Sequence, residues 1–226
     1  MSLGHGVNMV RSGLVFNFDA ANVKCYPGSG TSALDLARNS TTGELVNGPT
    51  YDSSGFFSFA TNDYIRFTNS TALDTQTFSI EVWVKTNALS QNGFWFEKGE
   101  VNTQYSLFQQ GTTIRCRINN GSTYVDAISV TTASYMNTTD WFQVVFTFTS
   151  GSQVCYINGQ VVGTGTRTAT LAANAGGMSM GAYGGYSGAR SYYYNGSLSI
   201  AKVYNRVLSA TEVQQNFNAI RGRYNI

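Results

Sequence analysis

An alternation of apolar and polar residues with a period of two constrains the fold of this chain more than any other feature of its sequence. In the clearest run the apolar positions are Phe78, Ile80, Val82 and Val84. Successive side chains of a strand point to opposite faces, so each such run predicts a β-strand with one face in a core. The other runs are 14–18, in which Leu14, Phe16 and Phe18 share a face, and 56–59, 64–67, 94–97, 105–109, 113–119, 125–130, 142–148 and 198–204.

Turn-forming residues separate these runs. The chain has 24 glycines and 2 prolines, and serine, threonine and asparagine occur throughout. The clearest turn is Asn158-Gly159, whose two residues supply the positive φ angles of a type I′ hairpin turn between 153–157 and 160–162. Many short strands joined in this way predict an all-β fold, an antiparallel sandwich or barrel.

One helix is expected near the end of the chain. Ser209 and Glu212 form the pattern of a capping box, and Val213, Phe217 and Ile220 follow at helical spacing. Their apolar stripe requires a sheet to pack on. Residues 1–12 have no alternating pattern and predict an N-terminal arm, whereas strands continue across every plausible boundary in 13–226, which predicts a single domain.

Charge and hydropathy argue against several classes of partner. Lys and Arg number 14 and Asp and Glu 12, a net charge of +2 with no basic run, so we expect no nucleic-acid partner. No apolar run approaches the ~20 residues of a membrane span, so we expect no membrane partner. The start, Met-Ser-Leu-Gly-His-Gly, lacks the order of a signal peptide, which predicts a cytoplasmic site of synthesis.

The sequence offers few residues that are suited to catalysis. A retaining glycosidase needs two carboxylates about 5 Å apart on one face, whereas Glu97 and Glu100 are three positions apart and Glu81 stands alone among apolar residues. The only histidine, His5, lies in the arm, which argues against triad chemistry and histidine metal sites. We therefore expect that the protein is not an enzyme and has no catalytic residues.

The three cysteines are widely spaced and form no Cys-x-x-Cys pair. Cys116 alternates with Ile114 and Ile118, and Cys155 alternates with Ile157. The pattern favours buried thiols, with a cross-strand disulfide as the alternative.

A glycine- and tyrosine-rich segment, GAYGGYSGARSYYYNG at 181–196, is the strongest candidate for a binding site. Flat aromatic rings with uncharged polar groups suit a sugar, and tyrosine with arginine equally suits a protein interface. A third interpretation is purely structural, with the consecutive tyrosines alternating between core and solvent. The candidate contact residues are Tyr183, Tyr186, Arg190, Tyr192, Tyr193, Tyr194 and Asn195.

From about Gly13 to its end the chain resembles the laminin-G-like, concanavalin A-like lectin and glucanase domains, which are two-sheet antiparallel jelly-roll sandwiches. With the expected helix, the resemblance implies such a sandwich carrying one short C-terminal helix. The resemblance is carried by GLVFNFDAA at 13–21, YPGSGT at 26–31, LVNGPTY at 45–51, DYI at 63–65, FSIEVWVK at 78–85, WFQVV at 141–145, YING at 156–159 and GSLSIAKVYNRVLSATE at 196–212.

The first two of these motifs, with NFNAIRGRY at 216–224, resemble most the version of the domain found in virion proteins of tailed bacteriophages. That resemblance implies a structural protein of the virion, most simply a capsid decoration or fibre accessory protein that binds capsid or other virion proteins. The N-terminal arm or the tyrosine-rich segment would dock on a neighbouring subunit, and our hypothesis is that residues 1–13 are the anchor, because an exposed arm without a pattern gains order only from a partner. The alternative is a carbohydrate-binding adhesin domain that recognises surface polysaccharide. Whether copies of the chain associate stays open.

Calcium is the one cofactor that the resemblance implies, because laminin-G-like domains often hold a structural calcium ion. Asp19, Asp63 and Asp140 are the candidate ligands near strand ends. Family members often carry an acidic pair in the strand before the last helix, where this chain has Ser199 and Ala201. We therefore expect no cofactor, keep calcium as the alternative, and expect Asp19 to cap the turn after the first strand.

Overall fold

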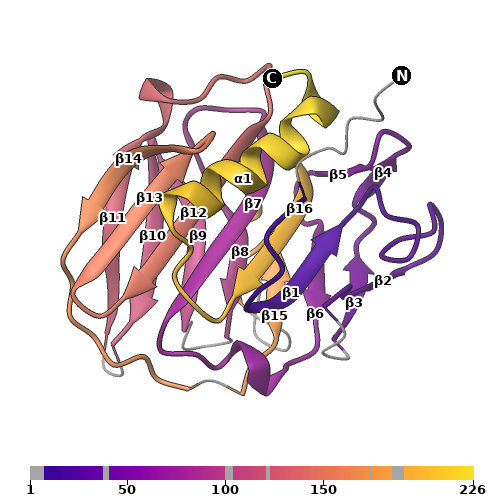
Figure 1. Cartoon of the computed structure of the whole chain (residues 1–226). Coiled ribbons are helices and arrows are strands. Elements are labelled where there is room, and N and C mark those ends of the chain that lie inside the picture. Colours follow the sequence, from indigo (N-terminus) through magenta and orange to yellow (C-terminus); the bar gives the residue numbers. More distant parts are fainter. Residues whose placement is uncertain (1–7, 38–40, 100–103, 121–122, 174, 185–190) are drawn as a thin grey trace, which may run out of the picture.

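The computed structural model describes the chain except for residues 1–7, 38–40, 100–103, 121–122, 174 and 185–190. Its strands form two eight-stranded antiparallel sheets packed face to face (Figure 1). Sheet 1 runs in the order β14 (Gln160–Gly165), β13 (Ser152–Ile157), β12 (Phe142–Thr149), β7 (Phe78–Thr86), β16 (Gly196–Tyr204), β5 (Phe56–Phe59) and β4 (Thr50–Asp52), and β1 (Leu14–Asp19) also pairs with β16.

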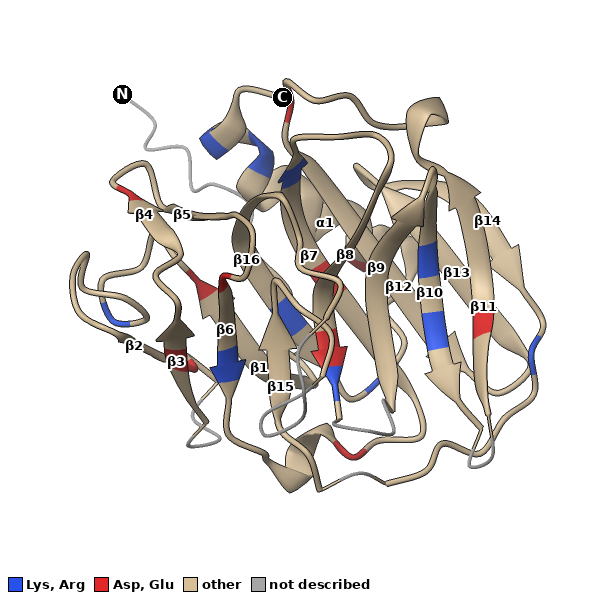
Figure 2. Ribbon diagram, turned by 180° about the vertical axis from the view of Figure 1, so that it is seen from behind, with Lys and Arg blue, Asp and Glu red and all other residues tan. Residues whose placement is uncertain are grey.

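Sheet 2 lies behind sheet 1 in the view of Figure 1 and faces the viewer in Figure 2. Its order is β11 (Tyr124–Thr131), β10 (Thr113–Asn119), β9 (Tyr105–Gly111), β8 (Gln91–Lys98), β15 (Met178–Met180), β6 (Tyr64–Phe67), β3 (Thr42–Val46) and β2 (Ser32–Leu34). The helical elements described are α1 (Ala210–Ile220) and the 3-10 turns η1 (Thr71–Leu73), η2 (Thr132–Ser134) and η3 (Arg221–Tyr224). The expected jelly-roll sandwich with one short C-terminal helix is confirmed.

The core between the sheets consists of the alternating apolar side chains. Phe78, Ile80, Val82 and Val84 of β7 are fully buried in it, and so are Ile114, Cys116 and Ile118 of β10. The sequence predicted that Leu14, Phe16 and Phe18 share one face of a strand, and this prediction is wrong for Leu14. A β-bulge between Leu14 and Phe16 turns Leu14 toward a second cluster on the outer face of sheet 1. The bulge inserts one residue and so reverses the alternation.

Two local predictions are confirmed in detail. Asn158 and Gly159 have φ angles of 51° and 78° and connect β13 to β14, as the type I′ turn requires. Ser209 caps α1, since its side chain accepts from the backbone of Glu212 and the Glu212 carboxylate accepts from the backbone of Ser209. The capping box therefore begins the helix at the expected residue.

Helix α1 lies across the outer face of sheet 1 (Figure 1). Its apolar residues Val213 and Phe217 are buried against this face, and the ring of Phe217 stacks on Trp83 at 5.9 Å. Beneath the helix, Lys202 Nζ of β16 lies 3.0 Å from Glu81 Oε1 of β7. The Glu81 carboxylate also accepts from Asn216 Nδ2 of the helix at 2.7 Å. The outer positions of β7 and β16 are thus buried as well as the inner ones.

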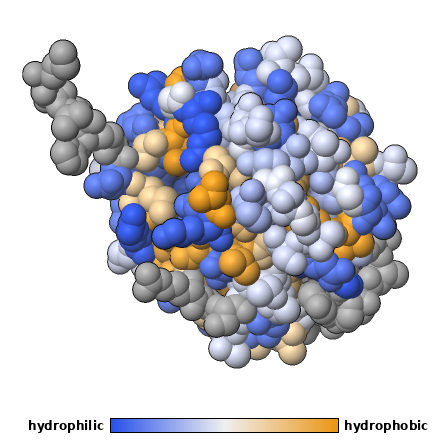
Figure 3. Space-filling model, turned by 90° about the vertical axis from the view of Figure 1, so that its right-hand side faces the viewer, coloured by the Kyte–Doolittle hydropathy of each residue, from blue (hydrophilic) through white to orange (hydrophobic). Residues whose placement is uncertain are grey.

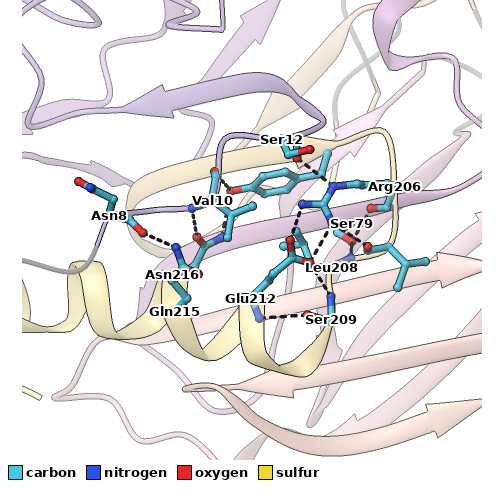
Figure 4. Close-up of polar contacts among 12 residues, drawn as sticks. Asn8, Val10, Ser12, Ser79, Arg206, Leu208, Ser209, Glu212, Gln215 and Asn216 are labelled. Carbon is cyan, nitrogen blue, oxygen red and sulfur yellow. Dashed lines mark hydrogen bonds and ion pairs between the residues drawn. The ribbon is translucent and has the colours of Figure 1, made fainter.

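Part of the expected N-terminal arm packs on the sandwich (Figure 4). The Val10 backbone N–H donates to Asn216 Oδ1 at 2.8 Å, and its carbonyl accepts from the Tyr204 hydroxyl at 3.1 Å. Gln215 Nε2 donates to the Asn8 carbonyl at 2.6 Å, and Arg206 Nε donates to the Ser12 carbonyl at 3.0 Å. Residues 8–12 are therefore docked on α1 and β16, whereas residues 1–7, including His5, lie outside the described part of the chain.

The surface of the sandwich shown in Figure 3 is mixed in character. On the face shown in Figure 3, apolar residues are interspersed among polar ones. None of the helices in the described ranges combines the length and apolar character that a transmembrane span needs. The outer face of sheet 2 carries no α-helix within the described residues (Figure 2), and residues 181–184 and 191–195 approach it instead.

Candidate ligand site on the outer face of sheet 2

Polar side chains form a row straight across the outer face of sheet 2. Each residue of the row is the antiparallel partner of the next, so the row follows the hydrogen-bonding direction of the sheet from β3 to β11. Figure 2 shows the charged positions distributed over these strands. In order, the residues are Glu44, Arg66, Ser179, Glu97, Ser106, Arg117 and Asp126.

A stacked aromatic pair lies beside this row. Phe94 of β8 and Phe108 of β9 are register partners, with ring centroids 4.2 Å apart and planes within 6°. A bulge between Phe94 and Phe96 turns Phe94 outward, whereas Trp95 and Phe96 both belong to the core. The guanidinium carbon of Arg117 lies 4.5 Å above the centre of the Phe108 ring, a cation–π arrangement.

The pair forms the floor of a small hollow. Phe94 and Phe108 are only 3% and 2% exposed, and the cavity above them has a volume of about 50 Å³. Clefts that take drug-sized ligands measure ~300–1,000 Å³, so this hollow is a shallow depression that takes one small group while the rest of a ligand lies at its mouth. The lining residues are Asn92, Phe94, Phe108, Gln109, Gln110, Arg117 and Tyr192.

Tyr192 forms the exposed wall of the hollow. Its side chain is 50% exposed, and its ring lies 6.3 Å from Phe94 and 6.1 Å from Tyr183. Its φ angle is +49°, a left-handed conformation that costs a bulky residue about 1–3 kcal/mol and is concentrated at functional sites. The exposed ring of Tyr192 is thus held at the hollow although the backbone of this residue adopts an unfavourable conformation.

Hydrogen bonds hold the tyrosine-rich segment on sheet 2. The Tyr192 carbonyl accepts from the Phe94 backbone N–H at 3.2 Å, and Tyr183 and Ser191 pair as a β-bridge. Glu97, fully buried, accepts from the Gly184 backbone N–H at 2.6 Å. Gly93 permits this approach, since a Cβ there would lie 2.7 Å from the Tyr194 Cα. The segment is therefore fastened to β8 on both sides of residues 185–190.

The three consecutive tyrosines have different surroundings. Tyr192 faces the hollow, and the half-buried Tyr193 lies 6.4 Å from Tyr64 of β6. Tyr194 is fully buried, packs edge-on against Trp95 at 6.2 Å and donates its hydroxyl to the Lys85 carbonyl at 2.9 Å. Burial raises the pKa of the Tyr194 hydroxyl far above its usual value.

Tyr194 therefore belongs to the core, and its assignment as a contact residue is corrected here, because a fully buried ring offers no surface to a ligand. The other candidates lie in different places. Asn195 is exposed, but its Oδ1 accepts from Asn87 Nδ2 at 2.8 Å and it does not line the hollow. Tyr186 and Arg190 lie outside the described residues. Tyr183 and Tyr192 come together at the hollow, Tyr183 supporting Tyr192 and Phe94.

The carboxylates weighed for catalysis do not converge within the described chain. Glu97 lies on the outer face of sheet 2 beneath the 181–184 segment, whereas Glu81 lies on the outer face of sheet 1 beneath α1. Glu100 lies outside the described residues. A glycosidase needs both of its carboxyl groups at one glycosidic bond, and Glu81 and Glu97 are on opposite sides of the sandwich.

The three candidate calcium ligands do not form one site. Asp19 makes a two-point ion pair with Arg223, at 2.7 and 3.1 Å, and its Oδ1 caps the following turn by accepting from the Ala21 backbone N–H, as expected. Asp63 accepts from the Ala60 backbone N–H, and Asp140 accepts from Asn137 Nδ2. In the described ranges no three His, Cys, Asp or Glu side chains gather as a metal would need. These residues do not fit a calcium ion.

The hollow itself was missed from the sequence, although two signals pointed to it. The run Phe94-Trp95-Phe96 indicates a strand that is covered on both faces. Arg115 and Arg117 alternate with the buried Ile114, Cys116 and Ile118, which places both arginines on the outer face of sheet 2. What the sequence did not show is that β8, β9 and β10 bring these residues together with Tyr192.

Comparisons with known proteins agree with this architecture. Residues 59–214, which include strands of both sheets, match the model of a laminin G family described as the Concanavalin A-like lectin/glucanases superfamily. No curated protein matches the sequence. The fold comparison finds the W1252A mutant of HCR D/C VPI 5995, with a TM-score of 0.71 and 12% identity over 92% of this chain and 52% of that chain.

Two further structures share the fold. The botulinum neurotoxin type G receptor binding domain has a TM-score of 0.67 and 14% identity, with 91% of this chain and 51% of that chain covered. A Trypanosoma rangeli sialidase in complex with sialic acid has a TM-score of 0.68 and 13% identity, with 96% of this chain and 35% of that chain covered. The chain thus spans about half the length of the toxin chains, and the likeness concerns the fold alone.

Neither the family match nor these structures support the narrower resemblance to phage virion proteins. The family match covers more than half of the chain and includes strands of both sheets. The chain therefore belongs to the Concanavalin A-like lectin/glucanases superfamily.

Proposed function

We propose that this protein is a non-catalytic carbohydrate-binding domain and that it binds a glycan at the hollow beside Tyr192. The observation that carries this proposal is the exposed, conformationally constrained Tyr192 ring above a floor of stacked phenylalanines. Sugars pack their apolar faces on aromatic rings and direct their hydroxyl groups to polar side chains at the rim.

The rim of the hollow supplies such polar groups. Asn92 uses its Oδ1 to accept from the Gly111 backbone N–H at 3.0 Å, which leaves its amide N–H groups for a ligand. Gln110, exposed in part, makes no side-chain hydrogen bond to any residue in the described ranges. The family and the receptor binding domains that share its fold favour recognition over catalysis, although fold alone does not assign a ligand.

The test is a glycan array followed by titration of any glycan that binds. We expect the wild-type protein to bind at least one glycan and Tyr192→Ala to weaken that binding about tenfold, which corresponds to ~1.4 kcal/mol. Tyr135→Ala is the matched control, because Tyr135 is 43% exposed and does not line the hollow. Absence of any bound glycan, or equal loss in both variants, would overturn the proposal.

Attachment to a phage particle is the second candidate, and the motifs at 13–21, 26–31 and 216–224 support it. Residues 8–12 are engaged with α1 and β16, so the arm available for an anchor is 1–7. Deleting residues 1–7 should then abolish co-sedimentation with the assembled particle without changing thermal stability. Undiminished co-sedimentation of the deletion variant would exclude an anchor at 1–7.

A further inference from the structure

The hollow contains a positive charge that its neighbours do not neutralise. Arg115 and Arg117 are adjacent on the outer face of β10, and both pair with the same carboxylate of β11, that of Asp126. Arg117 Nε lies 2.8 Å from Asp126 Oδ1, and Arg115 Nη1 bonds to Asp126 Oδ2. Two guanidinium groups share one carboxylate, so this cluster has a net charge of +1.

The geometry directs that charge toward the hollow. Arg117 lines the hollow, whereas Arg115 does not. Arg117 bonds to Asp126 through its Nε alone, and neither of its terminal nitrogens bonds to another residue of the described chain. Because its guanidinium lies over the Phe108 ring, its orientation is set before any ligand arrives.

The other groups left on the rim are mainly donors. Gln109, which also lines the hollow, donates its amide to the carbonyls of Ala88 and Gly111, at 3.2 and 3.3 Å, and so is occupied. The unused donors are the terminal nitrogens of Arg117, the Nδ2 of Asn92, the Nε2 of Gln110 and the Tyr192 hydroxyl, and the Oε1 of Gln110 is an unused acceptor beside them. A ligand that satisfies them must present several acceptors close together and one negative charge.

From these observations we infer that the glycan is an acidic one, and that Arg117 binds the charged group of a sugar ring with a single carboxylate or sulfate ester while Tyr192 contacts the ring. This inference rests on the proposed carbohydrate-binding function. A guanidinium matches a carboxylate or sulfate with two parallel N–H donors, which lysine does not. The hollow has a cavity volume of about 50 Å³, so the site takes the charged group of one such ring while the ring itself lies at the mouth against Tyr192.

The decisive experiment compares three probes by titration calorimetry at low and moderate salt: a uronic-acid oligosaccharide, its carboxyl-reduced counterpart, and a sulfated oligosaccharide of the same length. We expect the wild-type protein to bind one of the two acidic probes at least tenfold more tightly than the reduced probe, with affinity falling as salt rises. The two acidic arms identify whether the carboxylate or the sulfate is the natural group.

Three variants test whether Arg117 is the residue that binds the charged group of the sugar. Arg117→Gln should lose the preference for the acidic probe over the reduced probe, and Arg117→Lys should recover that preference only in part because lysine lacks the fork. Lys24→Gln changes the net charge equally, but Lys24 does not line the hollow and should leave the preference intact. Circular dichroism and thermal melting verify that each variant is folded.

The outcomes separate the two levels of the argument. If the wild-type protein binds the reduced probe as tightly as the acidic ones, and Tyr192→Ala still weakens binding about tenfold, the acidic-sugar inference is wrong and the carbohydrate-binding function stands. If Lys24→Gln has the same effect as Arg117→Gln, the preference is a long-range charge effect and the assignment to Arg117 is wrong. If no glycan of any class binds, both the inference and the function are overturned.

Discussion

At the scale of single residues, Glu212 shows how one side chain joins three segments. Its carboxylate accepts from the Ser209 backbone N–H at 2.9 Å and from Arg206 Nη1 and Nη2 at 2.8 and 2.6 Å (Figure 4). Arg206 in turn donates to the Ser12 carbonyl. The hydrogen bonds from Arg206, followed by those from Ser209, lower the pKa of Glu212 to about 2.

This depressed pKa predicts a pH dependence of stability. A carboxylate whose pKa falls on folding stabilises the protein fully above its unfolded pKa, here 4.5, and loses that contribution as the pH falls from 4.5 to about 2. Glu212→Gln should therefore be less stable than wild type at pH 7 by about 1 kcal/mol, the usual cost of a helix cap, and the difference should shrink as the pH falls from 4.5 to about 2. Urea unfolding at several pH values measures the difference.

The second variant for this test is Arg206→Gln, which removes the main cause of the shift and should reduce the pH dependence as well. A difference between wild type and Glu212→Gln that stays constant from pH 7 to pH 2 would contradict the assignment.

At the scale of elements, the buried ion pair between β7 and β16 connects sheet 1 to α1. Glu81 and Lys202 are almost completely buried, and Glu81 also accepts from Trp83 Nε1 at 3.1 Å and from Asn216 of the helix. A buried pair contributes little net stability relative to apolar residues, but loss of one partner leaves a charge in a medium of low dielectric constant. The cost of breaking the pair is therefore large.

We expect Glu81→Gln to lower the free energy of unfolding by about 3–5 kcal/mol at pH 7, because Lys202 then remains buried without a counter-charge. The double variant Glu81→Gln/Lys202→Met should regain most of this loss, since both charges are gone. Chemical denaturation of the three proteins makes the measurement. A single variant within about 1 kcal/mol of wild type would mean that water reaches the pair.

The docking of residues 8–12 gives a second prediction at this scale. Val10 is 8% exposed and packs with Val145, Tyr156, Tyr204, Leu208 and Val213. Val10→Ala removes two buried methyl-sized groups, so it should cost about 1.5 kcal/mol of stability at ~0.8 kcal/mol for each. The same change at Val23, which is 76% exposed, should cost almost nothing. Equal thermal melting of the two variants would show that residues 8–12 leave the sandwich in solution.

At the scale of the whole molecule, the core between the sheets is closed to solvent. Cys116 of sheet 2 and Cys155 of sheet 1 are both fully buried in it. Cys25 is buried in the same core cluster. All three are free thiols, so the expectation of buried thiols is confirmed. Burial raises the pKa of Cys25 to about 12 and that of Cys116 well above its usual value.

Thiolate is the reactive form of cysteine, so the native protein should react with a thiol-specific disulfide reagent only at the rate of its unfolding. In a denaturant the same reagent should titrate all three cysteines at once. Absorbance of the released chromophore follows both reactions. A rapid stoichiometric reaction of the native protein would show that the sandwich opens, and fewer than three titratable thiols in denaturant would point to the cross-strand disulfide.

The sequence by itself determined the local elements of this protein. The alternation in 78–85 assigned the faces of β7, Asn158-Gly159 assigned the β13–β14 turn, and Ser209 with Glu212 assigned the start of α1. Each of these depends on side-chain direction or backbone preference within a few residues, which the sequence states directly. Strands β2, β4 and β15 have only 3 residues, too few for an alternation to be recognised, and the five residues of β3, Thr-Gly-Glu-Leu-Val, do not alternate.

Only the tertiary structure decided what the outer faces present. The bulges after Leu14 and Phe94 reverse which side of a strand a residue occupies, and Tyr192, Tyr193 and Tyr194 separate into hollow, surface and core. The hollow joins residues of β8, β9 and β10 to Tyr192, and Asn216 reaches back 206 positions to Val10. Such contacts depend on strand register and on partners far away in the chain, which no local pattern encodes.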